Sequence, residues 1–122
     1  MEVSNQILSD IVVFNKYAKF LPSLGRRETF NEICDRYGDM MTTKHPHMEK
    51  DIKQAMKAVK QKKLLPSMRA MQFAGVAITK SESRIYNCAY LPIDDYRAFS
   101  EIMFLLLGGT GVGYSVQYKH VR

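Results

Sequence analysis

The chain has 122 residues and a formal net charge of +6; 46% of its residues are hydrophobic and 25% are charged. This length suits one small domain and excludes a complete large enzyme, and the composition is typical of a folded globular protein rather than a disordered tail. No apolar run reaches the roughly 18 residues that a membrane span needs, and the amino terminus lacks the pattern of a secretory signal, so we expect a cytoplasmic protein with no membrane partner.

Helices are predicted in the first half of the chain. Apolar residues recur at helical spacing over residues 7–21, and the turn-forming residues at 22–25 end this element. A second helix is predicted over residues 27–41, where the apolar positions i, i+3, i+4 and i+7 are Phe30, Ile33, Cys34 and Tyr37. Because Cys34 lies on this apolar stripe, we expect it to be an inert core residue.

Residues 44–63 hold nearly all of the excess positive charge, with seven lysines against Glu49 and Asp51. Apolar residues at spacings of three and four predict an amphipathic helix whose lysines face the solvent. A small basic nucleic-acid-binding module is the alternative function, although no arginine or aromatic residue interrupts the lysines as nucleic-acid platforms often require. The preceding His-Pro-His segment at 45–47 is interpreted as a loop, and no metal site is predicted because no second ligand cluster lies at a useful spacing.

The second half of the chain changes character. Residues 84–91 are rich in β-formers and bounded by serines and a proline, which predicts a strand. Asp94 and Asp95 then begin a helical run that continues to Gly108, and their carboxylates are placed to cap its first amides. A second strand is predicted over residues 112–118. The order of strand, helix and strand is typical of a right-handed crossover between parallel strands.

The glycine-rich segment at 108–113 invites comparison with nucleotide-binding loops. A dinucleotide loop follows a strand and opens a helix, whereas this segment follows a predicted helix and opens a strand. A phosphate loop needs a lysine after its last glycine, and Tyr114 stands there instead. The glycines therefore indicate either close approach of a ligand or tight packing, and both interpretations stay open.

Two cysteines occur, Cys34 and Cys88, and without a secretion signal we expect free thiols rather than a disulfide. Cys88 lies in the first predicted strand, two residues from Tyr86 and from Tyr90. A lone cysteine in a strand is usually a core residue, and a reactive thiol is the other interpretation.

Several segments, in order along the chain, resemble the ribonucleotide reductase catalytic subunit, most closely its adenosylcobalamin-dependent class. The matching segments are Gly-Arg-Arg-Glu-Thr at 25–29, Leu-Pro-Ser-Met-Arg-Ala-Met at 65–71, Asn-Cys at 87–88, and Gly-Thr-Gly-Val-Gly-Tyr-Ser-Val at 109–116. The resemblance implies an α/β fold, with an amino-terminal helical region over 1–63 followed over 64–122 by the first strand, helix, glycine loop and strand of a ten-stranded α/β barrel.

The same resemblance implies a role in converting ribonucleotides to deoxyribonucleotides for DNA synthesis. Cys88 matches the first of two reducing cysteines that end as a disulfide, and Ala70 and Asn87 match positions that line the ribonucleotide substrate. Gly111 would meet the substrate through its backbone, and Asp95 matches a position that binds the specificity effector in dimeric members. The implied partners are adenosylcobalamin, bound mainly by the rest of the enzyme, and a thiol reductant such as thioredoxin.

The departures from the family pattern are large. The chain has no second reducing cysteine, no radical-bearing cysteine in an Asn-Pro-Cys setting and no carboxy-terminal cysteine pair, and Cys34 matches none of these. The resemblance therefore implies a part of a reductase that is inactive without the remainder of the catalytic chain. The remaining alternative is a truncated remnant that has no function.

Overall fold

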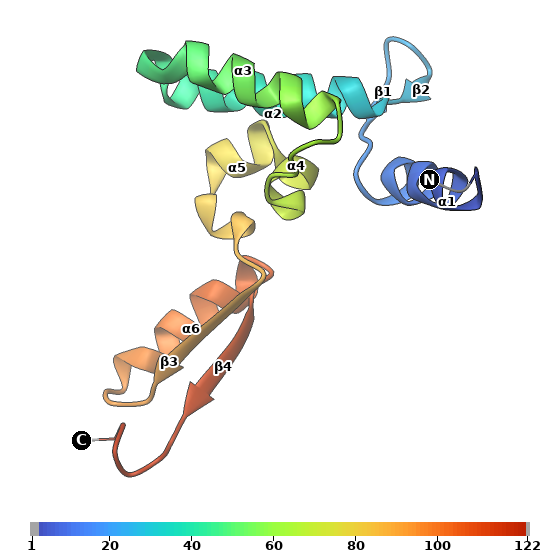
Figure 1. Cartoon of the computed structure of the whole chain (residues 1–122). Helices are drawn as coiled ribbons and strands as arrows, with labels where there is room; N and C mark the ends of the chain where they lie inside the picture. The colour runs from blue at the N-terminus through green and yellow to red at the C-terminus, as the bar shows by residue number, and fades with distance from the viewer. Residues whose placement is uncertain (1–2, 122) are drawn as a thin grey trace. The chain divides into compact units, whose positions relative to one another are not determined.

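The computed structural model describes residues 3–121 (Figure 1). The chain has two compact units, and the boundary between them in the sequence falls between Gly75 and Val76. Over these residues the chain is 59% helical and forms two small sheets of two strands each. A mixed helix and strand composition is thus confirmed at this coarse level. No barrel forms among residues 3–121, so the ten-stranded barrel stays a prediction.

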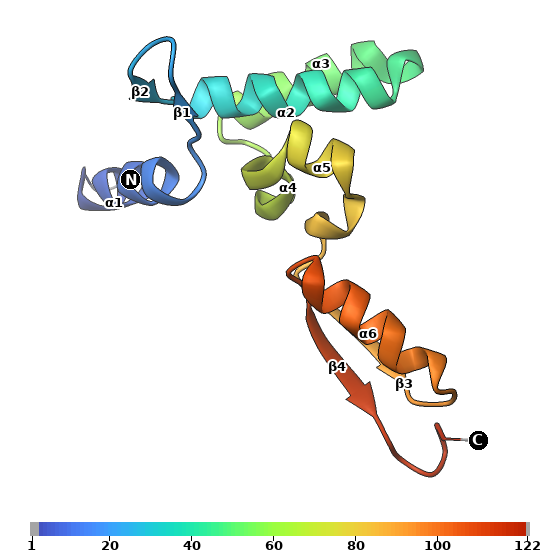
Figure 2. The same ribbon diagram turned by 180° about the vertical axis from the view of Figure 1, so that it is seen from behind.

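The amino-terminal unit is built from helices joined by short connections. Its helices are α1 (Val3–Lys16), α2 (Phe30–Lys44), α3 (Glu49–Lys60) and α4 (Met68–Phe73), with a single 3-10 turn, η1 (Pro46–Met48), between α2 and α3. A small antiparallel hairpin of β1 (Phe20–Leu21) and β2 (Arg26–Arg27) connects α1 to α2. Figures 1 and 2 show α2 and α3 side by side.

One hydrophobic cluster lies in this unit. Its buried members are Ala18, Ile33, Cys34, Met56, Val59 and Met71. Cys34 is wholly buried, as the apolar stripe of α2 predicted. Helix α3 contributes Met56 and Val59, while most of its lysines are exposed, so the predicted amphipathic helix is confirmed.

An ion pair between the buried Glu28 and the half-buried Arg36 ties the hairpin to two helices. Arg36 on α2 donates two hydrogen bonds to the Glu28 carboxylate, at 2.8 and 2.9 Å, and two more to the carbonyls of Met71 and Ala74. The Lys19 backbone N–H also donates to Glu28, at 3.0 Å. Burial alone would raise the pKa of Glu28, but these hydrogen bonds and the nearby positive charges outweigh it and lower that pKa.

The first two helices differ from prediction at their ends. The helix expected over 7–21 ends at Lys16, because the chain turns into the hairpin, where Phe20 pairs with Arg27. The helix expected from residue 27 begins at Phe30. Thr29 forms a capping box there, in which its side chain accepts the Glu32 N–H and the Glu32 carboxylate accepts the Thr29 N–H.

The carboxy-terminal unit contains a strand–helix–strand motif. Its elements are α5 (Val76–Lys80), a 3-10 turn η2 (Glu82–Ile85), β3 (Cys88–Pro92), α6 (Arg97–Leu107) and β4 (Gly111–Ser115). Strands β3 and β4 pair in parallel, with Cys88 opposite Gly111 and Pro92 opposite Ser115. The predicted parallel pair joined by a helix is therefore confirmed.

The strand predicted over 84–91 begins later than expected, so the prediction of its first residues is wrong. Residues up to Ile85 form the turn η2, in which the Arg84 N–H donates to the Ser81 carbonyl, and extended pairing begins only at Cys88. The second strand was predicted to reach residue 118, but it ends at Ser115. There the Ser115 hydroxyl accepts the Gln117 N–H and bonds the His120 ring, which turns the chain.

Candidate functional site

The structure brings three of the sequence-predicted site residues together at the first residues of β3 and β4. Cys88 lies opposite Gly111 in the parallel register, and the Gly111 N–H donates to the Asn87 carbonyl at 2.8 Å. The short connection between α6 and β4 is held by Thr110, which is 2% exposed and whose hydroxyl donates to the Tyr86 carbonyl. Cys88 itself is exposed, so this thiol is accessible rather than a core residue.

The glycines after α6 differ in whether a larger side chain would fit at their positions. A Cβ at Gly108 would lie 2.8 Å from the Ser83 hydroxyl oxygen, and Gly109 has φ = +85°, a conformation that other residues rarely adopt. Gly111 is different, because a Cβ there would meet only the Asn87 carbonyl, at an ordinary 3.6 Å. Packing thus explains Gly108, whereas the backbone of Gly111, the register partner of Cys88, is not crowded.

The face of the sheet that carries Cys88 is open around this residue, whereas Ser115 at the other end of the same face is buried. Side chains alternate along a strand, and the β3 residues that share a face with Cys88 are exposed, whereas Ala89 and Leu91 on the other face are half buried. Helix α6 contacts both strands, and the half-buried residues indicate that it packs on the face opposite Cys88. Tyr90 borders the thiol on the open face, with its ring 3.5 Å from the Cβ position of Gly113.

The other two predicted site residues belong to other elements of the chain. Asp95 follows the far end of β3, and its Oδ1 accepts the N–H of Arg97, the first residue of α6, at 2.9 Å. This agrees with the predicted role of Asp95 at the start of the helix, although the N-cap position itself is Tyr96, which has no side-chain cap. Together with its neighbours and Val121 it lines an open pocket of about 400 Å³. Ala70 belongs to α4 in the amino-terminal unit, where it is buried. Within the carboxy-terminal unit, the residues that lie together are therefore Asn87, Cys88 and Gly111.

The two cysteines have opposite environments. Burial raises the pKa of Cys34, which keeps this thiol protonated, and its side chain faces α3 rather than the solvent. Cys88 stands in the open at the beginning of a strand. Of the two thiols, Cys88 is the one that a substrate or a reductant can reach.

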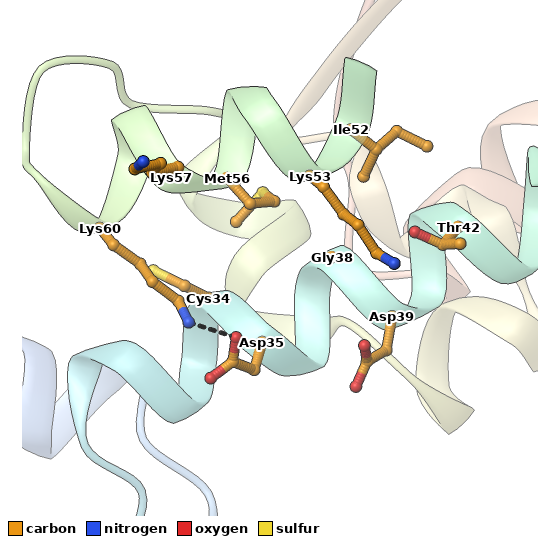
Figure 3. A pocket seen from close by; sticks show the side chains of 10 residues that line it. All are labelled: Cys34, Asp35, Gly38, Asp39, Thr42, Ile52, Lys53, Met56, Lys57 and Lys60. Carbon is orange, nitrogen blue, oxygen red and sulfur yellow. Dashed lines mark hydrogen bonds and ion pairs between the residues drawn. The ribbon is translucent and has the colours of Figure 1, made fainter. Parts of the chain in front are cut away.

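A groove between α2 and α3 was not predicted from the sequence (Figure 3). It measures about 320 Å³, and Lys60 of α3 forms an ion pair across it with Asp35 of α2. Gly38 allows the helices to approach, because a Cβ there would lie 3.1 Å from the Met56 Cγ. Asp35 and Asp39 stand four residues apart on α2 and therefore share one face of that helix. Two acidic residues on one face, followed by a lysine-rich helix, are the sequence signal that could have predicted this contact between α2 and α3.

No helix within residues 3–121 is long and apolar enough to cross a membrane. The same residues contain no group of three or more His, Cys, Asp or Glu side chains arranged to hold a metal ion. Comparison with protein-family models, with curated proteins and with solved structures gives no match to this chain.

Proposed function

We propose that this chain is part of a ribonucleotide reductase catalytic subunit and converts ribonucleotides to deoxyribonucleotides only when the rest of that subunit completes it. The observation that carries the proposal is the exposed Cys88 thiol, placed beside Asn87 and the open backbone of Gly111 at one end of two parallel strands. This arrangement agrees with the sequence resemblance, which assigns a reducing thiol and two substrate contacts to those positions.

The proposed chemistry of Cys88 is that of one half of a dithiol. Two cysteine thiols together give two hydrogen atoms to the substrate and join as a disulfide, while the ribose 2'-hydroxyl leaves as water and a C–H bond replaces the C–O bond. Cys88 provides one thiol, and the complementing polypeptide provides the second. A thiol reductant such as thioredoxin then reduces the disulfide, which requires the accessibility that Cys88 has.

The complementing polypeptide must also provide the radical-bearing cysteine, its neighbouring glutamate and most of the barrel. In this proposal it binds adenosylcobalamin, and the residues of this chain take no part in generating the radical. Asn87 and the Gly111 backbone contact the substrate. Ala70 and Asp95 keep their proposed substrate and effector roles, which rest on the resemblance alone.

Coexpression tests the proposal. The chain is produced with a polypeptide that contains an Asn-Pro-Cys segment, a glutamate close behind it and a second reducing cysteine, and ribonucleotide reduction is measured with adenosylcobalamin and a dithiol. We expect activity only with both polypeptides and at least a thousandfold loss, on the order of the effect of removing a covalent catalytic group, in Cys88→Ser. Cys34→Ala, which changes the buried thiol, is the matched control and should keep activity.

Absence of activity with a complete partner, or activity that survives Cys88→Ser, would contradict the proposal. The first result would indicate a truncated remnant whose motifs reflect its ancestry rather than a present function. The second result would show that Cys88 does not act as a reducing thiol. A nucleic-acid-binding module is supported less well, because Lys53 and Lys60 on the basic helix already pair with Glu49 and Asp35. That alternative requires binding to a duplex or single strand that weakens steeply with salt.

A further inference from the structure

Strand β4 presents a row of backbone groups that β3 does not use. The Gly111 N–H donates to Asn87, and the Ser115 carbonyl accepts the Ile93 N–H, so the odd-numbered residues of β4 direct their backbone groups toward β3. Backbone groups alternate sides along a strand. The N–H and C=O groups of Val112 and Tyr114 therefore point to the outer edge of β4, and the described sheet contains no third strand to receive them.

The outer edges of the two strands are not equivalent. On β3 the outward backbone groups belong to Cys88, Tyr90 and Pro92, and Pro92 has no N–H to donate. On β4 both outward residues keep their N–H groups. No charged side chain or proline interrupts residues 111–117, although such residues are the usual protection of an exposed edge. The edge of β4 is therefore the one prepared for a further strand.

The sequence of β4 is complementary to itself across that edge. An antiparallel pairing with a twofold axis at Gly113 places Val112 opposite Tyr114 of a second copy, and Tyr114 opposite the second Val112. Each of these pairs exchanges two backbone hydrogen bonds, using every outward group of the strand. Pairs of aromatic and β-branched residues are favourable across antiparallel strands, and no like charges face each other.

Helix α6 fits the same arrangement. It leaves several large apolar side chains exposed: Phe99, Met103, Phe104, Leu106 and Leu107. A twofold axis perpendicular to the sheet keeps both copies of α6 on one face. Since each helix lies over its own pair of strands and strands are spaced about 4.8 Å apart, the two helix axes would lie about 10 Å apart. Helices pack at about 8–10 Å, so each α6 would cover apolar surface of the other.

We propose that the edge of β4 is a homodimerisation surface, through which two copies of this chain form a four-stranded sheet in the order β3, β4, β4 and β3. The pairing uses backbone groups of Val112 and Tyr114 and buries part of the exposed apolar surface of α6. It uses neither the Cys88 thiol nor a substrate. It is the state of this chain on its own, because a complementing polypeptide that closed a barrel would pair with the same edge of β4.

The test compares two proline substitutions in the full chain. Tyr114→Pro removes an outward N–H from β4, and Tyr90→Pro removes an equivalent outward N–H from β3; neither N–H takes part in the pairing of β3 with β4. Light scattering coupled to size exclusion should give twice the 14.1 kDa chain mass for the unchanged protein and for Tyr90→Pro, and the single-chain mass for Tyr114→Pro. Helical circular dichroism confirms that both variants fold.

Hydrogen exchange gives a second measurement that needs no substitution. The Val112 and Tyr114 amides should become protected as the protein concentration rises through the dimerisation range, while the Tyr90 amide should not. A protein that is monomeric up to several hundred micromolar would overturn the proposal. A dimer that persists in folded Tyr114→Pro, or whose formation leaves the Val112 and Tyr114 amides unprotected, would also overturn it, because the copies would then meet through another surface.

Discussion

The two cysteines of this chain should differ in reactivity, because one thiol is buried and the other is exposed. Cys34 is wholly buried and its pKa is raised by that burial, whereas Cys88 is exposed at the start of β3. We expect a thiol reagent to modify one cysteine per native chain rapidly and both after denaturation, because the thiolate must form and be reached before it reacts. Absorbance counting with an aromatic disulfide, followed by peptide mapping, measures this. Fast modification of Cys34 in the native protein would contradict the packing of α2.

Glu32 gives the capping box of α2 a pH dependence. Hydrogen bonds from the Arg26 side chain and then from Thr29 lower the pKa of Glu32 to about 2. A carboxylate with a lowered native pKa stabilises the fold fully above its ordinary value of 4.5, and this contribution is lost as the pH falls toward 2. The difference in free energy of unfolding between the wild type and Glu32→Gln should therefore shrink between pH 4.5 and 2. Urea unfolding over this pH range measures it, and Arg26→Met should reproduce the effect.

At the scale of elements, the Glu28–Arg36 pair holds the hairpin, α2 and the end of α4 together. Arg36→Met would leave the buried Glu28 carboxylate without its cation and remove donors from the carbonyls of Met71 and Ala74. Removing one partner of a buried pair costs about 3–5 kcal/mol, whereas replacing both partners with apolar residues is often close to neutral. Urea unfolding should therefore show that Arg36→Met with Glu28→Leu costs much less than the two single changes added together. Additive losses would show that the two residues act independently.

The elements that the sequence predicted are those with a strong apolar period. The stripe that contains Ile33 and Cys34 identified α2, and apolar residues at spacings of three and four among the lysines identified α3. Element ends were harder to predict, because hydrogen bonds between particular groups determine them. The capping box at Thr29 excludes residues 27–29 from α2, and pairing of Phe20 with Arg27 ends α1 early. Periodicity carries no information about either interaction.

The candidate site was predicted in part for a similar reason. The parallel pair follows from the strand, helix and strand order, and this register places Gly111 opposite Cys88. The exposure of Cys88 did not follow, since a lone cysteine in a strand is usually buried. It depends on which face of the sheet α6 covers. Helices α4 and α5 were not predicted, because six and five residues are too few to establish a helical period.

At the scale of the whole molecule, stability should be concentrated in one unit. The largest hydrophobic cluster lies on α2, α3 and α4, while α6 has a single buried residue, Ala98. Native-state hydrogen exchange reports such differences, because amides in segments with few buried contacts open at lower cost. We expect the slowest amides in α2 and α3, and faster exchange in β3 and α6 at concentrations where the chain is monomeric. Uniform protection across both units would contradict this distribution.

Pro92 has a consequence for the size of any assembly that this sheet forms. Pairing of two β4 edges uses up the edge with complete hydrogen-bonding groups, and the resulting sheet then ends on both sides at β3. Each of those sides carries a proline that cannot donate. Because both copies use the same surface, the pairing closes after two copies. The prolines at the outer edges disfavour hydrogen bonding of further strands into a fibril. The twofold pairing thus limits the assembly to two copies, and one imino acid at a strand end makes the remaining edges poorer templates for growth into a polymer.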